Sequence, residues 1–422
     1  MRKKILILAH GHPAFSKGGG EIAAYNLYKT YNELGYDAYF VGAHKLEGLD
    51  HGGTPFSTYA PKEILFKSTM QDYFLLTMQN RGVVWNEFQD LLDYIDPDII
   101  HFHHYIHLGI ELLRGTRNWI EKKKPSAALF MTLHEYIAIC PNNGQMIKTT
   151  DNKLCYTYNP VDCKQCFPDR STTEFKMREL HIRSYLETVD HFVSPSYFLK
   201  DRYVTWGMDA DKISVIDNGQ LKDEKLAKRT LKNKNSNRSV FAYFGQINPF
   251  KGLDILLESL EYLPKKFLDE VDIQIHGSGL EHQSEAFQVK VRNLMDKYQK
   301  KVKFFGPYDP DELANLMKNV DWVVMPSIWW ENSPLVIQEA LKFGRPLIVS
   351  DIGGMKEKVK DGRDGLHFHY KNPQDLALAM QKAAEPEFYD TIYKKMATPL
   401  WLKEAAEKHL GLYDNISKHS LV

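Results

Sequence analysis

The chain has 422 residues, more than one domain core usually holds, so we expect two domains. Its 54 basic and 54 acidic side chains cancel to a formal net charge of zero, which argues against a nucleic-acid partner. The apolar run near the start is too short for a signal peptide, and no run approaches the ~20 apolar residues of a membrane span, so we expect a cytoplasmic protein.

Strands and helices alternate along the first half of the chain. Short apolar runs predict strands near residues 4–8, 38–41, 98–102, 129–133, 191–193 and 213–216. Apolar residues at helical spacing predict helices between them, including 21–34 and 82–94. This alternation is typical of a parallel sheet with helices on both faces, so we expect a first Rossmann-like domain over residues 1–219.

A second alternation follows a polar segment. Residues 220–239 are charged and lack apolar periodicity, so we interpret them as an interdomain linker. Strands are then predicted near residues 240–244, 271–276, 302–305, 321–325, 347–350 and 366–368. We expect a second Rossmann-like domain over 240–390, and a helical segment over 391–422 that is a candidate to cross back to the first domain. The predicted fold is α/β, with two doubly wound domains facing across a cleft where ligands bind at the strands' carboxyl ends.

Two glycine-rich loops follow predicted strands. Gly18, Gly19 and Gly20 stand immediately before a helix but lack the G-x-G-x-x-G spacing of a dinucleotide site. The stretch "HGSGLEHQ" has His282 where a third glycine would belong, so a dehydrogenase is not favoured. The triplet is a candidate for a loop that lets backbone approach a ligand, and a loop without a ligand is the alternative.

The stretch "MPSIWWENSPLVIQEALKFGRP" places two carboxylates on either side of a helix start. Ser333 is a favoured N-cap type and Pro334 suits the first helical position, so the helix is predicted to begin at Pro334. Its free N–H groups, from Leu335 onward, favour a phosphate. Glu339 lies about one turn along the same face and Glu331 lies in the loop, so a nucleotide-sugar fits both. Two solvated glutamates are the alternative.

Several stretches carry a family resemblance. They include "PDIIHFHH", "LFMTLHEY", "FAYFGQINPFKGLDILLESL" and residues 302–368, which contain an E-x7-E pattern in a strand-loop-helix setting. Together they resemble the retaining glycosyltransferases of family 4, whose GT-B fold has two Rossmann-like domains. The resemblance implies transfer of a sugar from UDP- or GDP-sugar to a glycan or lipid-linked glycan acceptor in cell-surface polysaccharide synthesis. The alternative is a GT-B nucleotide-sugar epimerase or a binding subunit without turnover.

The resemblance also implies roles for residues of the second predicted domain. Glu331 matches the family's glutamate at the donor sugar, and Glu339 matches the one that binds the ribose hydroxyls. The backbone of Asn332, Ser333 and Leu335 would hold sugar and diphosphate.

Further matches concern the charge on the donor. Lys251 matches the lysine that neutralises the leaving diphosphate, and Gln246 stands where the family usually has an arginine. His134 matches the histidine that reaches the transferred sugar, and Gly19 and Gly20 match the glycine loop near the donor phosphate. Catalytic roles are therefore expected for His134, Glu331 and Lys251, with no divalent cation needed for catalysis.

The four cysteines are a departure from that pattern. Cys140, Cys155, Cys163 and Cys166 follow a C-x14-C-x7-C-x2-C spacing within a polar insert of about residues 138–170. Reduced thiols are expected in the cytoplasm, and four thiolates suit zinc or an iron–sulfur cluster. An insert with little core of its own needs an additional stabilising interaction, so we expect a structural metal, with free thiols as the alternative.

Two other clusters have modest interpretations. His101, His103, His104 and His107 are interpreted as strand-end packing rather than a second metal site. The basic run "EKKKP" at 121–125 is a candidate for peripheral contact with the inner face of the membrane, and a solvated helix end is the alternative.

Overall fold

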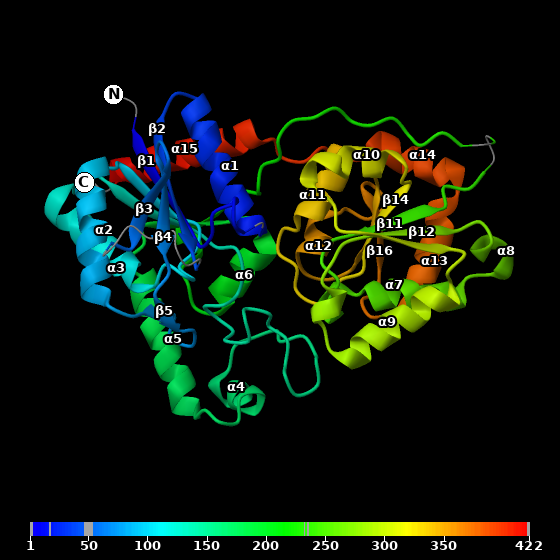
Figure 1. Cartoon of the computed structure of the whole chain (residues 1–422), viewed down its shortest axis with the longest axis horizontal. Helices are drawn as coiled ribbons and strands as arrows, with labels where there is room; N and C mark the ends of the chain where they lie inside the picture. The colour runs from blue at the N-terminus through cyan, green and yellow to red at the C-terminus, as the bar shows by residue number, and fades with distance from the viewer. Residues whose placement is uncertain (1–2, 17, 46–53, 232, 234–235, 420–422) are drawn as a thin grey trace. The chain divides into compact units, whose positions relative to one another are not determined.

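The computed structural model describes residues 3–16, 18–45, 54–231, 233 and 236–419. The chain forms two compact units (Figure 1), the first made of Met1–Gly219 with Leu400–Val422 and the second of Gln220–Pro399. Each unit is a sheet with helices around it, which confirms the predicted α/β class. Among the described residues, no helix combines the length and apolar character that a membrane crossing requires.

The first unit is built on one large sheet. In its described residues the strand order is β10-β9-β8-β7-β1-β2-β4-β3, and β3 alone runs antiparallel to its neighbour. The bounds are β1 Lys4–Ala9, β2 Asp37–His44, β3 Phe56–Ala60, β4 Glu63–Lys67, β7 Ile99–Phe102, β8 Ala128–Thr132, β9 His191–Ser194 and β10 Ile213–Val215. A separate hairpin pairs β5 Met70–Asp72 with β6 Thr77–Met78. The sequence analysis did not predict β3 to β6.

The helices of the first unit come from both ends of its sequence. They are α1 Gly19–Glu33, α2 Arg81–Ile95, α3 Glu111–Lys123, α4 Pro160–Cys166, α5 Thr172–Leu186, α6 Tyr197–Thr205 and α15 Leu402–His419, with a short η1 Ala210–Lys212. The helix α15 packs beside α1 and contributes Leu402, Ala406 and Tyr413 to the same core as β1. The Tyr413 hydroxyl lies 2.6 Å from Nδ1 of the buried His101. The last helix is therefore part of this unit's interior.

The second unit has a fully parallel sheet in the order β13-β12-β11-β14-β15-β16. Its strands are β11 Val240–Phe244, β12 Asp272–His276, β13 Val302–Gly306, β14 Trp322–Met325, β15 Leu347–Ser350 and β16 Gly365–Phe368. Its helices are α7 Leu253–Ser259, α8 Lys265–Leu268, α9 Glu285–Lys297, α10 Leu313–Lys318, α11 Leu335–Lys342, α12 Gly353–Lys358, α13 Pro373–Ala384 and α14 Pro386–Lys395. Each strand predicted in this half is present.

The segment interpreted as a linker, residues 220–239, is fastened to the second unit. Arg229 and Arg238 both pair with the fully buried carboxylate of Asp321, at 2.5 and 3.3 Å. Lys225 donates to the Tyr393 carbonyl at 2.7 Å. The segment forms no helix in its described residues, yet several of its charged side chains bind groups of the second unit.

Candidate functional site

The strand-loop-helix segment lies in the middle of the second unit's sheet. The strand β14 pairs with β11 on one side and β15 on the other, so the loop after Met325 leaves the sheet at its carboxyl edge. The helix α11 begins at Leu335, one residue after the predicted start, because Pro334 has an extended backbone with ψ 130° and serves as the N-cap.

Three donors fix the Glu331 carboxylate in this loop. Its Oε1 accepts hydrogen bonds from Lys251 Nζ at 2.6 Å, from Ser327 Oγ at 2.9 Å and from Trp329 Nε1 at 2.9 Å. The residue is only 5% exposed. A buried carboxyl group is costly unless it is hydrogen-bonded, so these bonds hold the Glu331 side chain in one orientation.

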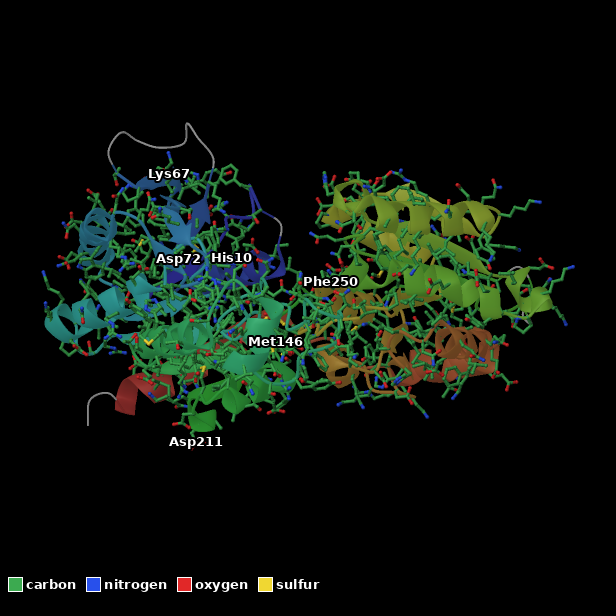
Figure 2. The ribbon with its side chains drawn as sticks, turned by 90° about the horizontal axis from the view of Figure 1, so that it is seen from below. His10, Lys67, Asp72, Met146, Asp211 and Phe250 are labelled. Carbon is green, nitrogen blue, oxygen red and sulfur yellow. The ribbon has the colours of Figure 1, made fainter. Side chains whose placement is uncertain are left out.

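The loop after β11 delivers Lys251 to this carboxylate. The Asn248 side chain accepts from the backbone N–H groups of Phe250 and Lys251, at 3.0 and 3.1 Å, which fixes the turn (Phe250 is labelled in Figure 2). Gly252 has φ 69°, and a Cβ there would lie 2.0 Å from the Pro326 carbonyl oxygen. Only glycine permits this approach, so the loops after β11 and β14 are locked together. The structure thereby brings together Lys251 and Glu331, two site residues that were predicted from the sequence.

A glycine pair supports the loop from its other side. The Gly354 N–H donates to the Glu331 carbonyl at 2.6 Å, and a Cβ on Gly354 would lie 1.6 Å from the Asn332 carbonyl oxygen. The start of α12 therefore presses directly on the backbone at residues 331–332. The sequence analysis missed this support, although the letters "IGGMKE" after a predicted strand contain the signal.

Glu339 lies on α11 with a partly buried side chain. Burial raises its pKa to about 7, and Lys342 opposes that change. Burial and the Glu339 carboxyl together raise the pKa of Tyr308, which places that ring near the glutamate. The first turn carries a bond from Gln338 Nε2 to Ser333 Oγ at 3.1 Å. Glu339 is therefore a carboxyl poised between its two protonation states near neutral pH.

An aromatic ladder covers the carboxyl ends of the neighbouring strands. The rings of Phe244 and His276 stack at 4.7 Å, and His276 stacks on Phe305 at 4.7 Å. Tyr308 stands edge-on to Phe244 at 5.6 Å. The sequence analysis missed this ladder, whose signal is an aromatic residue at or just after the end of each of three consecutive predicted strands.

Gln246 occupies an exposed position in the loop after β11. The Tyr243 hydroxyl donates to its carbonyl oxygen at 2.5 Å, so the backbone there is fixed. A Cβ on Gly277 would lie 1.9 Å from the Gly245 carbonyl oxygen, so the loop after β12 packs closely against it. The side chain is neutral, and Lys251 is the cation that the structure brings to Glu331.

The glycine loop of the first unit turns directly into a helix. Gly19 and Gly20 form the first turn of α1, with Gly18 as its N-cap. A Cβ on Gly20 would lie 3.1 Å from His10 and 3.4 Å from the His134 ring (His10 is labelled in Figure 2). The structure therefore brings the predicted residues Gly20 and His134 together.

A buried carboxylate explains the glycine at position 18. Glu21 is only 4% exposed, and a Cβ on Gly18 would lie 2.2 Å from its Oε2. Burial acts to raise its pKa, but hydrogen bonds from His10 and Ser16 prevail and lower it to about 2. The sequence analysis missed Glu21, which is an ionised group held beside the glycine loop.

His134 is a neutral imidazole in this setting. Burial, reinforced by His104 and His10, lowers its pKa to about 3. Its Nε2 lies 3.1 Å from Nδ1 of His103, and the two rings stack. One nitrogen of that pair donates and the other accepts. His134 can therefore exchange hydrogen bonds at neutral pH without carrying charge.

The pKa of Glu135, the residue after His134, is raised rather than lowered. Burial raises its pKa to about 8, and its Oε1 lies 3.2 Å from His104 Nε2. At neutral pH the carboxyl is mostly protonated and can donate a hydrogen bond. Such perturbed groups are enriched at functional sites, and the sequence offered no signal for this one because its burial comes from distant residues.

Three predicted clusters remain: the histidines, the four cysteines and the basic run at residues 121–125. His101 and His103 are buried at the strand ends, and no group of three or more His, Cys, Asp or Glu side chains in the described ranges is arranged as a metal site. The four cysteines nevertheless line one small cavity, so the structural metal stays a prediction.

In the basic run, Lys123 pairs with Asp93, and Lys124 pairs with two aspartates, which supports the solvated helix end.

Two family models match successive parts of the chain. The model described as Glycosyltransferase Family 4 matches residues 17–220, and the model described as Glycosyl transferases group 1 matches residues 224–398. Each unit is therefore matched by its own model.

Curated relatives and solved structures agree with these models. A D-inositol 3-phosphate glycosyltransferase of Corynebacterium aurimucosum is 25% identical over 296 residues, 69% of this chain and 65% of that protein. The chain spans 62% and 65% of the first two curated relatives it matches, less than two thirds of either.

Two solved structures cover nearly the whole chain. Anabaena HepE in complex with UDP and glucose aligns with a TM-score of 0.63 at 17% identity, over 98% of this chain and 100% of that one. The apo form of the lipopolysaccharide outer core galactosyltransferase WaaB aligns with a TM-score of 0.63 at 16% identity, over 99% and 100%. These likenesses confirm the predicted GT-B fold.

Proposed function

Because the chain belongs to the family 4-like glycosyltransferases of the GT-B fold, we propose that it transfers a sugar from a UDP- or GDP-sugar to a glycan or lipid-linked glycan acceptor. The observation that carries this proposal is the Lys251–Glu331 pair at the carboxyl edge of the second unit's sheet, beside the helix that bears Glu339. The named complexes of HepE with UDP and UDP-glucose support a nucleotide-sugar donor. The name of WaaB supports a role in cell-surface polysaccharide synthesis.

The donor would lie along α11. Its phosphates meet the free N–H groups from Leu335 and the backbone of Asn332 and Ser333, where the helix dipole favours negative charge. Glu339 accepts hydrogen bonds from the ribose hydroxyls in its ionised form. Lys251 supplies the positive charge for the diphosphate, so no divalent cation is required.

The sugar end of the donor would meet Glu331. Because three donors already fix its carboxylate, it orients the sugar and stabilises positive charge at the anomeric carbon without reorganising. We assign it no covalent bond to the sugar. The acceptor oxygen attacks on the face from which the diphosphate leaves, the acceptor's proton passes to the leaving phosphate, and the anomeric configuration is retained.

The first unit would contribute the acceptor side. The role proposed for His134 is a hydrogen bond to a hydroxyl of the transferred sugar, which suits a neutral imidazole. The protonated Glu135 beside it can donate to an acceptor hydroxyl. Both residues act by positioning polar groups rather than by adding charge.

The test uses a panel of UDP- and GDP-sugars. Thermal shift identifies the donor, and transfer to glycan acceptors is then followed with and without EDTA, with the product's anomeric configuration read by proton NMR. We expect one donor to be used, with retention and no loss in EDTA. Inversion or a need for divalent cation would refute the mechanism. Nucleotide release at full rate without any acceptor would favour the epimerase alternative.

A further inference from the structure

We infer that Cys140, Cys155, Cys163 and Cys166 bind one zinc ion that holds residues 140–166 in their fold. This site belongs to the first unit and is independent of the transferase chemistry proposed above. Its assignment rests on the four thiols that line one cavity, on the small local core, and on a buried cation that forms no ion pair in the described residues.

The convergence comes from three separate pieces of chain. Cys140 follows the turn after β8, Cys155 follows a bridge between Ile147 and Leu154, and the other two cysteines lie on α4. All four line one cavity of about 20 Å³. Side chains spread over residues 140–166 thus line the same cavity, where they can supply the four ligands of a tetrahedral thiolate site.

Backbone hydrogen bonds hold the cysteines in place. The N–H groups of Cys140, Cys155 and Cys163 each donate to a carbonyl at 2.8 Å. The carbonyl of Cys166 accepts from Thr149 Oγ1 at 2.6 Å. These bonds bring the ligands close together before any ion binds, which lowers the entropy cost of assembling the site.

The segment has almost no core of its own. The helix α4 buries none of its residues, and the buried apolar side chains of residues 140–166 are Met146, Ile147 and Leu154 (Figure 1 shows α4 within a stretch otherwise drawn as loop). A seven-residue helix is not stable by itself in water. With so little apolar burial, another interaction must order this stretch, and a structural zinc site supplies folding energy directly.

Arg178 supplies an independent observation. Its guanidinium is 1% exposed and donates to the carbonyls of Phe74 and Ala138, at 2.8 and 2.6 Å. No carboxylate forms an ion pair with it in the described residues. A buried cation without counter-charge is costly. Arg178 donates to Ala138, two residues before Cys140, and zinc with four thiolates would carry a net charge of about −2.

The cavity also favours a single ion over a cluster. Its volume of about 20 Å³ holds one water-sized occupant, whereas a four-iron cluster needs far more room. Lys148 and Asp162 line the same cavity 3.8 Å apart, so their charges offset each other beside the thiols. The volume of the cavity therefore favours a single zinc ion.

The first test uses the full-length wild-type protein, purified under reducing conditions without chelator. Elemental analysis should find about one zinc per chain. Replacement of zinc by cobalt should give the intense absorption of tetrahedral thiolate coordination. Four thiols that titrate promptly in the folded protein, with no zinc retained after zinc is added back, would overturn the inference, as would iron with sulfide at the site or disulfides between these cysteines.

The second test compares two matched double variants. Cys163→Ser with Cys166→Ser should lose the zinc, and residues 140–166 should exchange their amide hydrogens at least about tenfold faster, while residues 240–390 keep their protection. The control, Lys164→Ser with Gln165→Ser, changes the two exposed residues between the cysteines and should keep the ion. Equal zinc content or equal exchange in the two variants would contradict the assignment.

Discussion

Replacement of Glu339 by Gln tests the ribose assignment through its pH dependence. Burial raises the pKa of this carboxyl from 4.5 to about 7, which corresponds to about 3 kcal/mol between its two protonation states. If the ribose hydroxyls bind the ionised form, a falling pH must protonate Glu339 and weaken the donor. At a pKa of about 7, roughly one carboxyl in ten is ionised at pH 6 and nine in ten at pH 8, so wild-type affinity should rise about tenfold between them.

The assay is calorimetric titration with UDP and GDP at pH 6, 7 and 8 at constant ionic strength. Glu339→Gln should bind about ten- to a hundredfold more weakly at pH 8, because the charge-assisted bonds are lost, and its remaining pH dependence should come from the nucleotide alone. Glu285→Gln, which changes an exposed carboxyl on α9, should behave like wild type. Parallel pH profiles for wild type and Glu339→Gln would refute the ribose role.

The same residue predicts a change in stability. Because the folded pKa is raised, the folded state binds the proton more tightly than the unfolded state does. As far as this group is concerned, the free energy of unfolding should therefore be highest below pH 4.5 and should fall as the pH rises to about 7. Glu339→Gln should remove that loss and unfold at a higher temperature than wild type at pH 8. A variant less stable than wild type at pH 8 would contradict the inferred burial of the charge.

Three further substitutions test the Lys251–Glu331 pair and the core of the first unit. Glu331→Gln should keep nucleotide affinity and cut turnover at least about tenfold, and loss of binding to the bare nucleotide would argue against its sugar-side role. Lys251→Met should weaken diphosphate binding and destabilise the protein by about 1–3 kcal/mol, because the buried Glu331 carboxyl loses one of its three donors. The double variant with Glu331→Gln should be less destabilised than the two changes summed, as measured by urea unfolding. Tyr413→Phe should cost about 1–2 kcal/mol, because His101 and Tyr31 lose a buried partner, and unchanged unfolding would contradict that network.

The sequence predicts the second unit well because its strands are short apolar runs between polar loops. Each strand from β11 to β16 has such a run, and the apolar periodicity of α11 is equally clear. The strands β5 and β6 were missed because segments of three and two residues are too short to show alternation. Apolar patterns in the sequence therefore reveal the strands and helices that have enough buried residues in a row, or at helical spacing, to show the pattern.

Polar residues were harder to interpret. The charged character of residues 220–239 predicted a solvated linker, but Arg229 and Arg238 share the buried Asp321. The pKa of Glu21 is lowered by hydrogen bonds from His10 and Ser16, and the pKa of Glu135 is raised by burial, and both effects depend on the folded arrangement. Charge patterns alone do not reveal which acidic group will pair with which basic one, so the three-dimensional structure is needed to find such sites.

The return of α15 to the first unit has a consequence for biosynthesis. Residues 220–399 form one continuous stretch, so the second unit can complete its sheet while the ribosome is still translating. The first unit emerges earlier but lacks Tyr413 until the last helix has left the exit tunnel. We therefore expect the amino-terminal half to wait, incompletely closed, for the carboxy-terminal helix, and chaperones would encounter its exposed α1 face during that interval.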